Sequence, residues 1–306
     1  MNNLVYLSFG RGSHVDELVY SVLCALHMIG PDRSSYRIIM YTDHPSALAQ
    51  LPVHIEPLSE KALTDWAGPF DFNHRRKIFV IKDALEKFGD RLLYCDSDTF
   101  FTKHPKKAFA RVRPQHTVMH IGEYHLYDSC AQKLLDFVQG HELQDPAGRR
   151  WNMTPATAMF NAGVIGIHGS DISLLDEVLH LTDQIYPHVK IPVIEQFAFS
   201  VCFQQRTKLH QSYEIIHHYW PPVLRALFGG QLSRVLHDGS IQSDEEKFRL
   251  LLPHQPSLEV RPFQWGRQGF SQRFGPSLRS WLSQAAEQAG VKTHLKRVVK
   301  WAGLLN

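Results

Sequence analysis

Apolar residues fall into short runs and helical stripes that alternate over the first hundred positions. Residues 4–9 form an apolar run that ends at Gly10-Arg11-Gly12, which predicts a buried first strand. The next stripe recurs every three or four residues from Val15 to Leu26 and stops at Gly30-Pro31, as a helix does. The same patterns predict a strand at 36–42, a helix at 78–88 and a strand at 92–95. This alternation predicts an α/β fold with a mainly parallel sheet flanked by helices.

The loops that follow these strands carry polar residues. In a parallel sheet the carboxyl ends of the strands lie along one edge, where ligands collect. Residues 10–13, Asp43 and Asp96-Ser97-Asp98 each follow a predicted strand. We therefore expect these three loops to share one rim of the sheet. Asp43 is there either as a contact to a nucleoside or as a cap or turn residue.

The pattern continues to about residue 230 and then changes. It predicts strands at 117–121, 163–167 and 213–217, and helices at 171–185 and 195–205. From 231 to 276 the chain is polar and interrupted by Pro and Gly, and two terminal helices are expected at 277–289 and 291–305. We therefore expect a main domain over residues 1–230 and a C-terminal helical extension over residues 231–306.

Charge and hydropathy narrow the class of protein. Lys and Arg number 33 against 30 Asp and Glu, a formal net charge of +3, which argues against a nucleic-acid-binding protein. No apolar run approaches the length of a membrane span, and the first residues lack the features of a signal peptide, so a cytoplasmic location is expected. The four cysteines are far apart, form no C-x-x-C pair, and are expected to be reduced and mostly buried: Cys24, Cys95, Cys130 and Cys202.

The sharpest chemical signal is the segment Asp96-Ser97-Asp98. An apolar strand delivers two carboxylates, two residues apart, into a loop, and apolar residues resume at Phe100-Phe101. Carboxylate oxygens suit Mg²⁺ and Mn²⁺, which also bind substrate phosphates. The alternative is a capped turn without a ligand, since Asp residues also stabilise turns. At the end of a buried strand we favour the metal site.

Four further segments complete a pattern around this D-x-D sequence. In chain order they are Arg76-Lys77-Ile78, Phe160-Asn161-Ala162-Gly163-Val164, Glu195-Gln196 and His217-His218-Tyr219-Trp220. Together they resemble the D-x-D glycosyltransferases of the GT-A fold, in particular the family of glycogenin and the bacterial lipopolysaccharide galactosyltransferases. The resemblance covers roughly residues 1–225. It implies a Rossmann-like GT-A domain and an activity of the hexosyltransferase type.

The resemblance implies a role for each matching residue. Asp98 and His218 are expected to bind Mn²⁺ or Mg²⁺ directly, and Asp96 to reach the metal or the ribose of the donor. Glu195 and Asn161 are expected at the sugar, where Glu195 either deprotonates an acceptor hydroxyl or stabilises the donor. The residues expected to bind the nucleotide-sugar donor are Phe9, Gly10, Arg11, Asp43, Arg76, Lys77 and Ser97, of which Arg76 and Lys77 add positive charge at the diphosphate.

Each of these residues also has a structural alternative. Lys77 and Arg76 also fit a solvated helix start, Glu195 a helix N-terminus that the dipole stabilises, and Asn161 a turn. The late histidine also fits a core position, and either His217 or His218 is the candidate ligand, because the His-x-x-Gly-x-x-Lys-Pro-Trp ending of the family is not present. We favour His218, since a His-Tyr-Trp ending recurs in related bacterial transferases. Glu195 stands where the family often has Asp.

These observations predict a metal-dependent glycosyltransferase that uses a nucleotide-sugar donor, expected to be UDP-linked, and a glycan or lipid-linked acceptor, as in bacterial polysaccharide or lipopolysaccharide synthesis. The alternatives are a sugar-phosphate nucleotidyltransferase and a non-catalytic protein that binds a sugar nucleotide. Residues 291–306 place apolar positions on one helical face and Lys292, Lys296 and Lys300 on another, without Asp or Glu. That composition fits either peripheral contact with the inner face of a membrane or a helix docked on the domain.

Overall fold

The structure is a computed structural model, which describes residues 1–241, 243–256 and 262–263. The strands are β1 (Asn2–Ser8), β2 (Tyr36–Thr42), β3 (His54–Pro57), β4 (Arg91–Cys95), β5 (Thr99–Phe101), β6 (His116–Met119), β7 (Gly122–His125), β8 (Ala158–Phe160), β9 (Val164–His168), β10 (Lys208–Gln211) and β11 (Ile216–His218). The α-helices are α1 (His14–Ile29), α2 (Glu60–Ala67), α3 (Arg75–Phe88), α4 (Lys106–Phe109), α5 (Gln132–Gly140), α6 (Leu174–Val189), α7 (Ile194–Arg206), α8 (Pro222–Leu236) and α9 (Asp244–Leu251).

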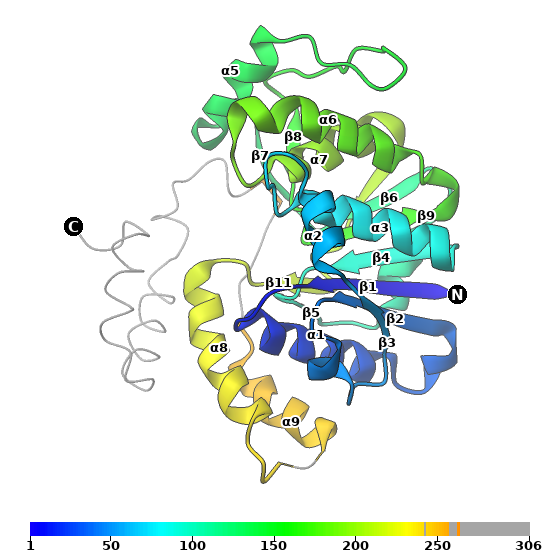
Figure 1. The fold of residues 1–306 in the computed structure, drawn as a ribbon, viewed down its shortest axis with the longest axis vertical. Coiled ribbons are helices and arrows are strands. Elements are labelled where there is room, and N and C mark those ends of the chain that lie inside the picture. Colours follow the sequence, from blue (N-terminus) through cyan, green and yellow to red (C-terminus); the bar gives the residue numbers. More distant parts are fainter. Residues whose placement is uncertain (242, 257–261, 264–306) are drawn as a thin grey trace, which may run out of the picture.

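A seven-stranded sheet forms the centre of the molecule (Figure 1). Its strand order is β10-β6-β9-β4-β1-β2-β3. In the β4-β1-β2-β3 part of the sheet each strand runs parallel to the next, β10 runs parallel to β6, and β9 is antiparallel to both β4 and β6. The predicted α/β architecture with a mainly parallel sheet is therefore confirmed. The antiparallel strand β9 matters for the site, because it brings the residues that precede it to the carboxyl end of β4.

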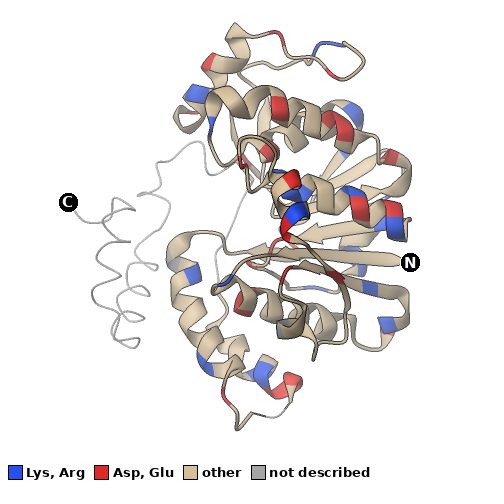
Figure 2. Ribbon diagram, in the orientation of Figure 1, with Lys and Arg blue, Asp and Glu red and all other residues tan. Residues whose placement is uncertain are grey.

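Alternate residues of each central strand enter different cores. On β1, Val5 packs with α3, α6 and α7, whereas Leu4 and Tyr6 pack with α1 on the opposite face. This is the two-residue period of a strand that is covered on both faces. Figure 2 shows that most of the strand ribbon is uncharged and that Lys, Arg, Asp and Glu lie mainly on helices and loops.

Helices α8 and α9 add a third apolar cluster against α1. Tyr20 and Cys24 of α1 pack there with Phe228 of α8 and Phe248 of α9. The Tyr20 and Phe228 rings meet edge to face, with their centroids 5.0 Å apart. The predicted boundary at residue 230 falls within α8. Residues of α8 on both sides of that position pack against α1.

The hydrophobic pattern locates most of the long elements but misses the 15-residue helix α8 and several short elements. Strand β2 has the predicted bounds, and α1, α3, α6, α7, β4 and β9 differ from prediction by a few residues at their ends. The third strand of the second half is shorter than expected, at Ile216–His218, and short elements such as β3, β7, β8 and α2 carry too few residues to show a period. All four cysteines are free and only Cys130 is exposed, as expected.

The terminal segments expected to be helical, 277–289 and 291–305, lie outside the described residues, and so does the segment 291–306 expected at a membrane. Within the part of the chain that the structure describes, no helix combines the length and the apolar character needed to cross a membrane.

The three predicted loops do share one rim. The backbone N–H of Gly10, after β1, donates to both carboxylate oxygens of Asp43, after β2, at 3.1 and 3.0 Å. The loop after β1 and the Asp96–Asp98 loop after β4 both line one cavity. The Asp43 carboxylate therefore ties the first two loops together.

We expect that replacing Phe248 by Ala destabilises the whole domain by about 3–5 kcal/mol, because it removes a buried ring between α1 and α9. Urea unfolding followed by circular dichroism measures this as a shift of one transition. Leu250→Ala on the same helix is the control, since Leu250 is 45% exposed and its truncation changes stability by at most about 0.5 kcal/mol. A Phe248→Ala protein with an unchanged main transition would show that α9 unfolds separately.

Candidate active site

A cavity of 660 Å³ opens at the carboxyl ends of β1 and β4. Its volume is in the range of pockets that enclose small molecules. The polar and aromatic side chains that line it come from β1, α1, α3, β4, β7, α7, β11 and α8 and from the loops beside them: Ser8, Phe9, His14, Asn73, His74, Lys77, Tyr94, Asp96, Ser97, Asp98, Glu123, Tyr124, Asn161, Glu195, Gln196, His218, Trp220 and Arg225.

The D-x-D segment is a turn between β4 and β5. The Thr99 hydroxyl donates to the backbone carbonyl of Asp96 at 2.8 Å, which closes the turn. The Asp96 backbone N–H donates to the carbonyl of Gly163 at 2.8 Å, so the turn is also fixed to the start of β9. The Asp96 carboxylate accepts from Tyr94 Oη at 2.9 Å and from Lys77 Nζ at 3.1 Å.

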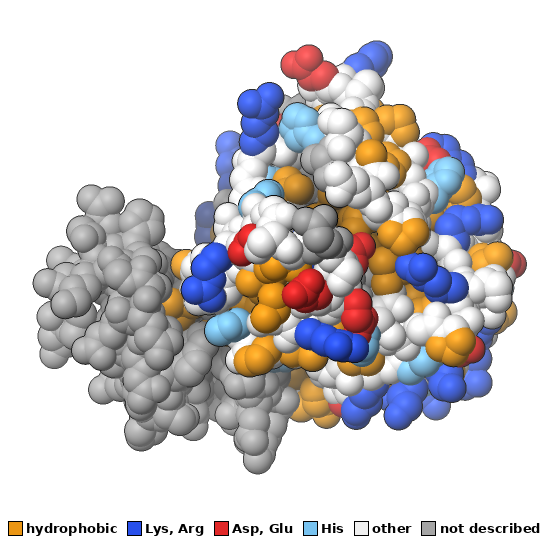
Figure 3. All heavy atoms as spheres, turned by 90° about the horizontal axis from the view of Figure 1, so that it is seen from below, with side chains coloured by type: hydrophobic (Ala, Val, Ile, Leu, Met, Phe, Trp, Pro, Cys, Tyr) orange, Lys and Arg blue, Asp and Glu red, His pale blue; other side chains and the backbone are white. Residues whose placement is uncertain are grey.

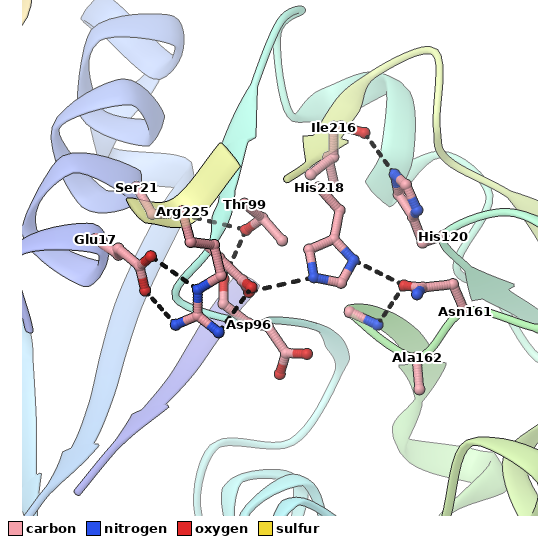
Figure 4. A network of polar contacts seen from close by, with 12 residues as sticks. Glu17, Ser21, Asp96, Thr99, His120, Asn161, Ala162, Ile216, His218 and Arg225 are labelled. Atoms are coloured by element: carbon pink, nitrogen blue, oxygen red, sulfur yellow. Dashed lines mark hydrogen bonds and ion pairs between the residues drawn. The ribbon is translucent and has the colours of Figure 1, made fainter. Parts of the chain in front are cut away.

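Asp98 is a buried carboxylate with two basic neighbours. His218 Nε2 lies 3.2 Å from its Oδ1, and Arg225 Nη1 lies 3.4 Å from its Oδ2. Burial by itself raises the pKa of Asp98, but His218 and Arg225 outweigh burial and hold that pKa far below its usual value. Arg225 also makes a two-pronged ion pair with Glu17 of α1, which Figure 4 shows beside His218 and Asn161. Asp98 is therefore charged and held in place.

His218 is fixed on its other side by the segment before β9. Its Nδ1 lies 2.8 Å from Asn161 Oδ1. The backbone of Gly163 passes directly beneath the ring, because a Cβ on Gly163 would lie 2.3 Å from His218 Nδ1. Only glycine leaves room for the imidazole at this position, which gives a steric reason for the Asn-Ala-Gly sequence.

Asp96, Asp98 and His218 form the only group of three or more potential metal ligands among the described residues. One ligand atom from each lies within 4.8 Å of the others. Two carboxylates and an imidazole suit Mn²⁺, and the carboxylates suit Mg²⁺. His217 points elsewhere on β11, where its ring lies 5.0 Å from that of Phe100, and burial lowers its pKa to about 4. The geometry therefore favours His218 over His217.

Lys77 and Glu195 form a buried ion pair beside the D-x-D turn. Lys77 Nζ lies 3.5 Å from Glu195 Oε1 and donates to the carbonyl of Ala162 at 3.0 Å. Burial by itself lowers the pKa of Lys77, but Asp96 and Glu195 together keep it above its ordinary value. Glu195 is 3% exposed, and its Oε2 has no hydrogen-bond partner among the described residues. A buried carboxylate oxygen without a donor is costly, so it indicates a place for a donor from a ligand.

The structure separates the other predicted donor-binding residues into two groups. Phe9 and Ser97 line the cavity with Lys77, whereas Gly10, Arg11 and Asp43 do not. Arg76 also lies off the cavity: its Nε donates to the Leu63 carbonyl at 2.7 Å, and its guanidinium lies 4.7 Å from the centre of the Phe9 ring. Arg76 therefore supports the wall of the cavity through Phe9.

Sequence reasoning missed three charged or polar residues of the site. Arg225 lies near the start of a helix that carries no motif, and His14 lies in the first turn of α1 with its Nε2 buried and without a partner among the described residues. Glu123 lies on the short strand β7, which the hydrophobic pattern did not reveal. The roles of Arg225 and Glu123 depend on contacts across long stretches of chain, which a single sequence does not contain.

Solved structures that are similar to the chain include three glycosyltransferases. Glycosyltransferase GlyE of Streptococcus pneumoniae TIGR4 is 14% identical with a TM-score of 0.42, over 69% of this chain and 45% of GlyE, so the match spans less than half of that protein. Galactosyltransferase LgtC, in complex with donor and acceptor sugar analogues, is 12% identical with a TM-score of 0.48, over 86% of this chain and 98% of LgtC. Mouse xyloside xylosyltransferase 1 is 10% identical with a TM-score of 0.45, over 69% and 85%. No protein-family model and no curated protein matches the chain.

We expect Gly163→Ala to displace the His218 ring, since the added methyl group overlaps Nδ1 and Cε1. Overpacking of this kind costs about 1–3 kcal/mol of stability, which urea unfolding measures. A crystal structure of the variant should show His218 Nδ1 beyond hydrogen-bond distance of Asn161. Gly229→Ala in α8 is the control, because a Cβ there meets no described atom within 4 Å and alanine favours a helix. An unmoved His218 in the Gly163→Ala variant would contradict the steric argument.

Proposed function

We propose that the protein is a metal-dependent glycosyltransferase that moves a sugar from a nucleotide-sugar donor to an acceptor. The observation that carries the proposal is the convergence of Asp96, Asp98 and His218 beside Lys77 in one cavity at the carboxyl edge of the sheet. The metal-ligand group and Lys77 both suit a ligand that carries a diphosphate, since a divalent cation and a lysine each bind phosphate oxygens.

The charge balance of the cavity supports a cation there. Four carboxylates line it, from Asp96, Asp98, Glu123 and Glu195, whereas Lys77 and Arg225 supply two permanent positive charges among its described lining residues, and Arg225 also pairs with Glu17. Asp96, Asp98 and His218 would hold the cation. A divalent cation bound there would neutralise charge on the departing diphosphate as a Lewis acid. Lys77 lies beside Asp96 and Arg225 beside Asp98, so they are the two side chains that would bind phosphate oxygens.

The role proposed for Glu195 is at the transferred sugar. Glu195 lies in the first turn of α7, where the helix dipole stabilises its charge, and Lys77 anchors its Oε1. Its Oε2 is the acceptor without a partner among the described residues, so a hydroxyl group of a bound sugar can donate to it. We propose that Glu195 either stabilises the donor sugar or takes a proton from an acceptor hydroxyl, and that Asn161 holds the adjoining metal ligand.

The donor is proposed to be UDP-linked and the acceptor a glycan or a lipid-linked sugar. Phe9 offers an aromatic face on the cavity wall, and such faces stack on nucleobases. The metal is proposed to be Mn²⁺ or Mg²⁺. Contact of residues 291–306 with an anionic membrane, in a cytoplasmic protein, is our proposal from their composition, and co-sedimentation with anionic vesicles tests it. No feature of the described residues favours the alternative of a sugar-phosphate nucleotidyltransferase.

We expect UDP to raise the melting temperature of the protein only when Mn²⁺ is present, because a ligand that binds the folded state alone stabilises it. EDTA should abolish the shift. His218→Ala should abolish it as well, whereas His217→Ala, its matched control on the same strand, should retain most of it. A full shift in excess EDTA, or a greater loss in His217→Ala, would exclude the proposed ligand set.

We expect Glu195→Gln to lower turnover by at least about tenfold and to leave UDP affinity nearly unchanged, since the charge is needed at the reacting sugar. Release of UDP from a panel of UDP-hexoses measures turnover, and calorimetry with Mn²⁺ and UDP measures binding. Glu177→Gln is the control, because Glu177 pairs with Arg206 outside the cavity. Unchanged turnover with a lower melting temperature would make Glu195 structural, and binding without any UDP release in the wild type would indicate a non-catalytic protein.

A further inference from the structure

Glu123 accepts hydrogen bonds from two side-chain amides at the back of the cavity. Asn161 Nδ2 donates to its Oε1 at 3.0 Å, and Gln196 Nε2 donates to its Oε2 at 2.9 Å. All three side chains are buried, with Glu123 6% exposed. A carboxylate only accepts, so each amide must turn its NH₂ group toward Glu123 and its oxygen away. The carboxylate therefore determines the orientation of both amides.

The orientation of Asn161 in turn determines which nitrogen of His218 carries a proton. Asn161 Oδ1 faces two groups, the backbone N–H of Gly163 at 2.9 Å and His218 Nδ1 at 2.8 Å. An amide oxygen only accepts, so Nδ1 must be the donor. When the imidazole is neutral, its lone pair is then on Nε2, which is the nitrogen that faces Asp98.

We propose that Glu123 is a positioning residue that fixes the tautomer of His218 through Asn161, so that Nε2 is the nitrogen available to a cation. This inference rests on the metal site proposed above. Metal-binding histidines commonly depend on such a partner for the other ring nitrogen, and loss of the partner weakens metal binding by about 10- to 100-fold. Here the partner is an amide that a buried carboxylate orients.

The two ring nitrogens of His218 each face one side chain, Asn161 at Nδ1 and Asp98 at Nε2. His120 packs edge to face against His218, with ring centroids 5.5 Å apart, and its own Nε2 faces the Ile216 carbonyl at 3.0 Å. Gly163 has no side chain that could separate His218 from Asn161. A proton on His218 Nε2 can donate to Asp98, and a cation would take its place, while Nδ1 keeps its proton in both cases.

Replacing Glu123 by glutamine tests the proposal, because the glutamine side chain has only one accepting oxygen. In Glu123→Gln one of the two amides must face an NH₂ group. If Asn161 turns, its NH₂ group opposes the Gly163 N–H and requires the other tautomer of His218. Combining Glu123→Gln with Asn161→Asp reverses donor and acceptor at their contact. The pair of substitutions restores the hydrogen bonds that join position 123 to Gln196 and position 161, and position 161 to Gly163 and His218, at unchanged net charge, because a carboxylate oxygen at position 161 again accepts from His218 Nδ1.

The experiment combines Mn²⁺ titration of the full-length protein with long-range ¹H–¹⁵N spectra of its histidine rings without metal. Signals of His218 are assigned by comparison with His218→Ala. The wild type should show a protonated Nδ1. Glu123→Gln should lose that signature and bind Mn²⁺ about 10- to 100-fold more weakly, and the double variant should recover both. Glu214→Gln is the control, because Glu214 pairs with Arg111 away from the cavity.

The outcomes separate this inference from the metal site itself. A wild type that binds no Mn²⁺ would overturn both. A wild type that binds Mn²⁺ with the proton of neutral His218 on Nε2 would overturn the role of Glu123 alone. So would a Glu123→Gln protein that binds Mn²⁺ weakly with an unchanged His218 spectrum, since Glu123 would then act only through its charge. If Glu123→Gln fails to fold, the wild-type spectrum and the double variant still decide the question.

Discussion

The site depends on the burial of several carboxylates at one edge of a sheet. Asp98 is 5% exposed and close to Asp96, and like charges in such a place repel unless cations lie beside them. The cations come from distant parts of the chain, with Lys77 from α3 and Arg225 from α8. The fold therefore has to bring α3 and α8 to the end of β4, and the carboxylates that remain in excess make the cavity suitable for a metal ion.

The tripeptide Asn161-Ala162-Gly163 connects the parts of the site, and each residue contributes a different chemical group. Asn161 uses its side chain between Glu123 and His218. Ala162 uses its backbone, whose carbonyl accepts from Lys77 and whose N–H donates to Gln196 Oε1. Gly163 uses its lack of a side chain. The segment can serve in this way because β9 runs antiparallel to β4, which places its beginning beside the D-x-D turn.

The parts of this site that the sequence predicts are those encoded by short segments. Asp96 and Asp98 follow an apolar strand directly, and that pattern places them at the sheet edge without knowledge of other elements. The role of Arg225 rests on a contact with Glu17, 208 residues away, and Glu123 lies on a four-residue strand with no visible period. The prediction that Arg76 adds charge at a diphosphate rests on its place next to Lys77, which lines the cavity whereas Arg76 does not. Adjacent residues of a helix point in different directions, and Arg76 instead reaches Leu63 and Phe9.

The ion pair of Glu17 with Arg225 links the stability of the helical layer to the chemistry of the cavity. Glu17 is 1% exposed, and burial raises its pKa although Arg225 opposes that shift. Arg225 lies on α8, which packs with α9 on α1 through the third apolar cluster. The face shown in Figure 3 has scattered Lys and Arg with Asp and Glu toward its centre, so exposed charge there is mixed. Because α8 carries both the cluster and the cation beside Asp98, apolar packing on α1 holds the charge balance of the site in place.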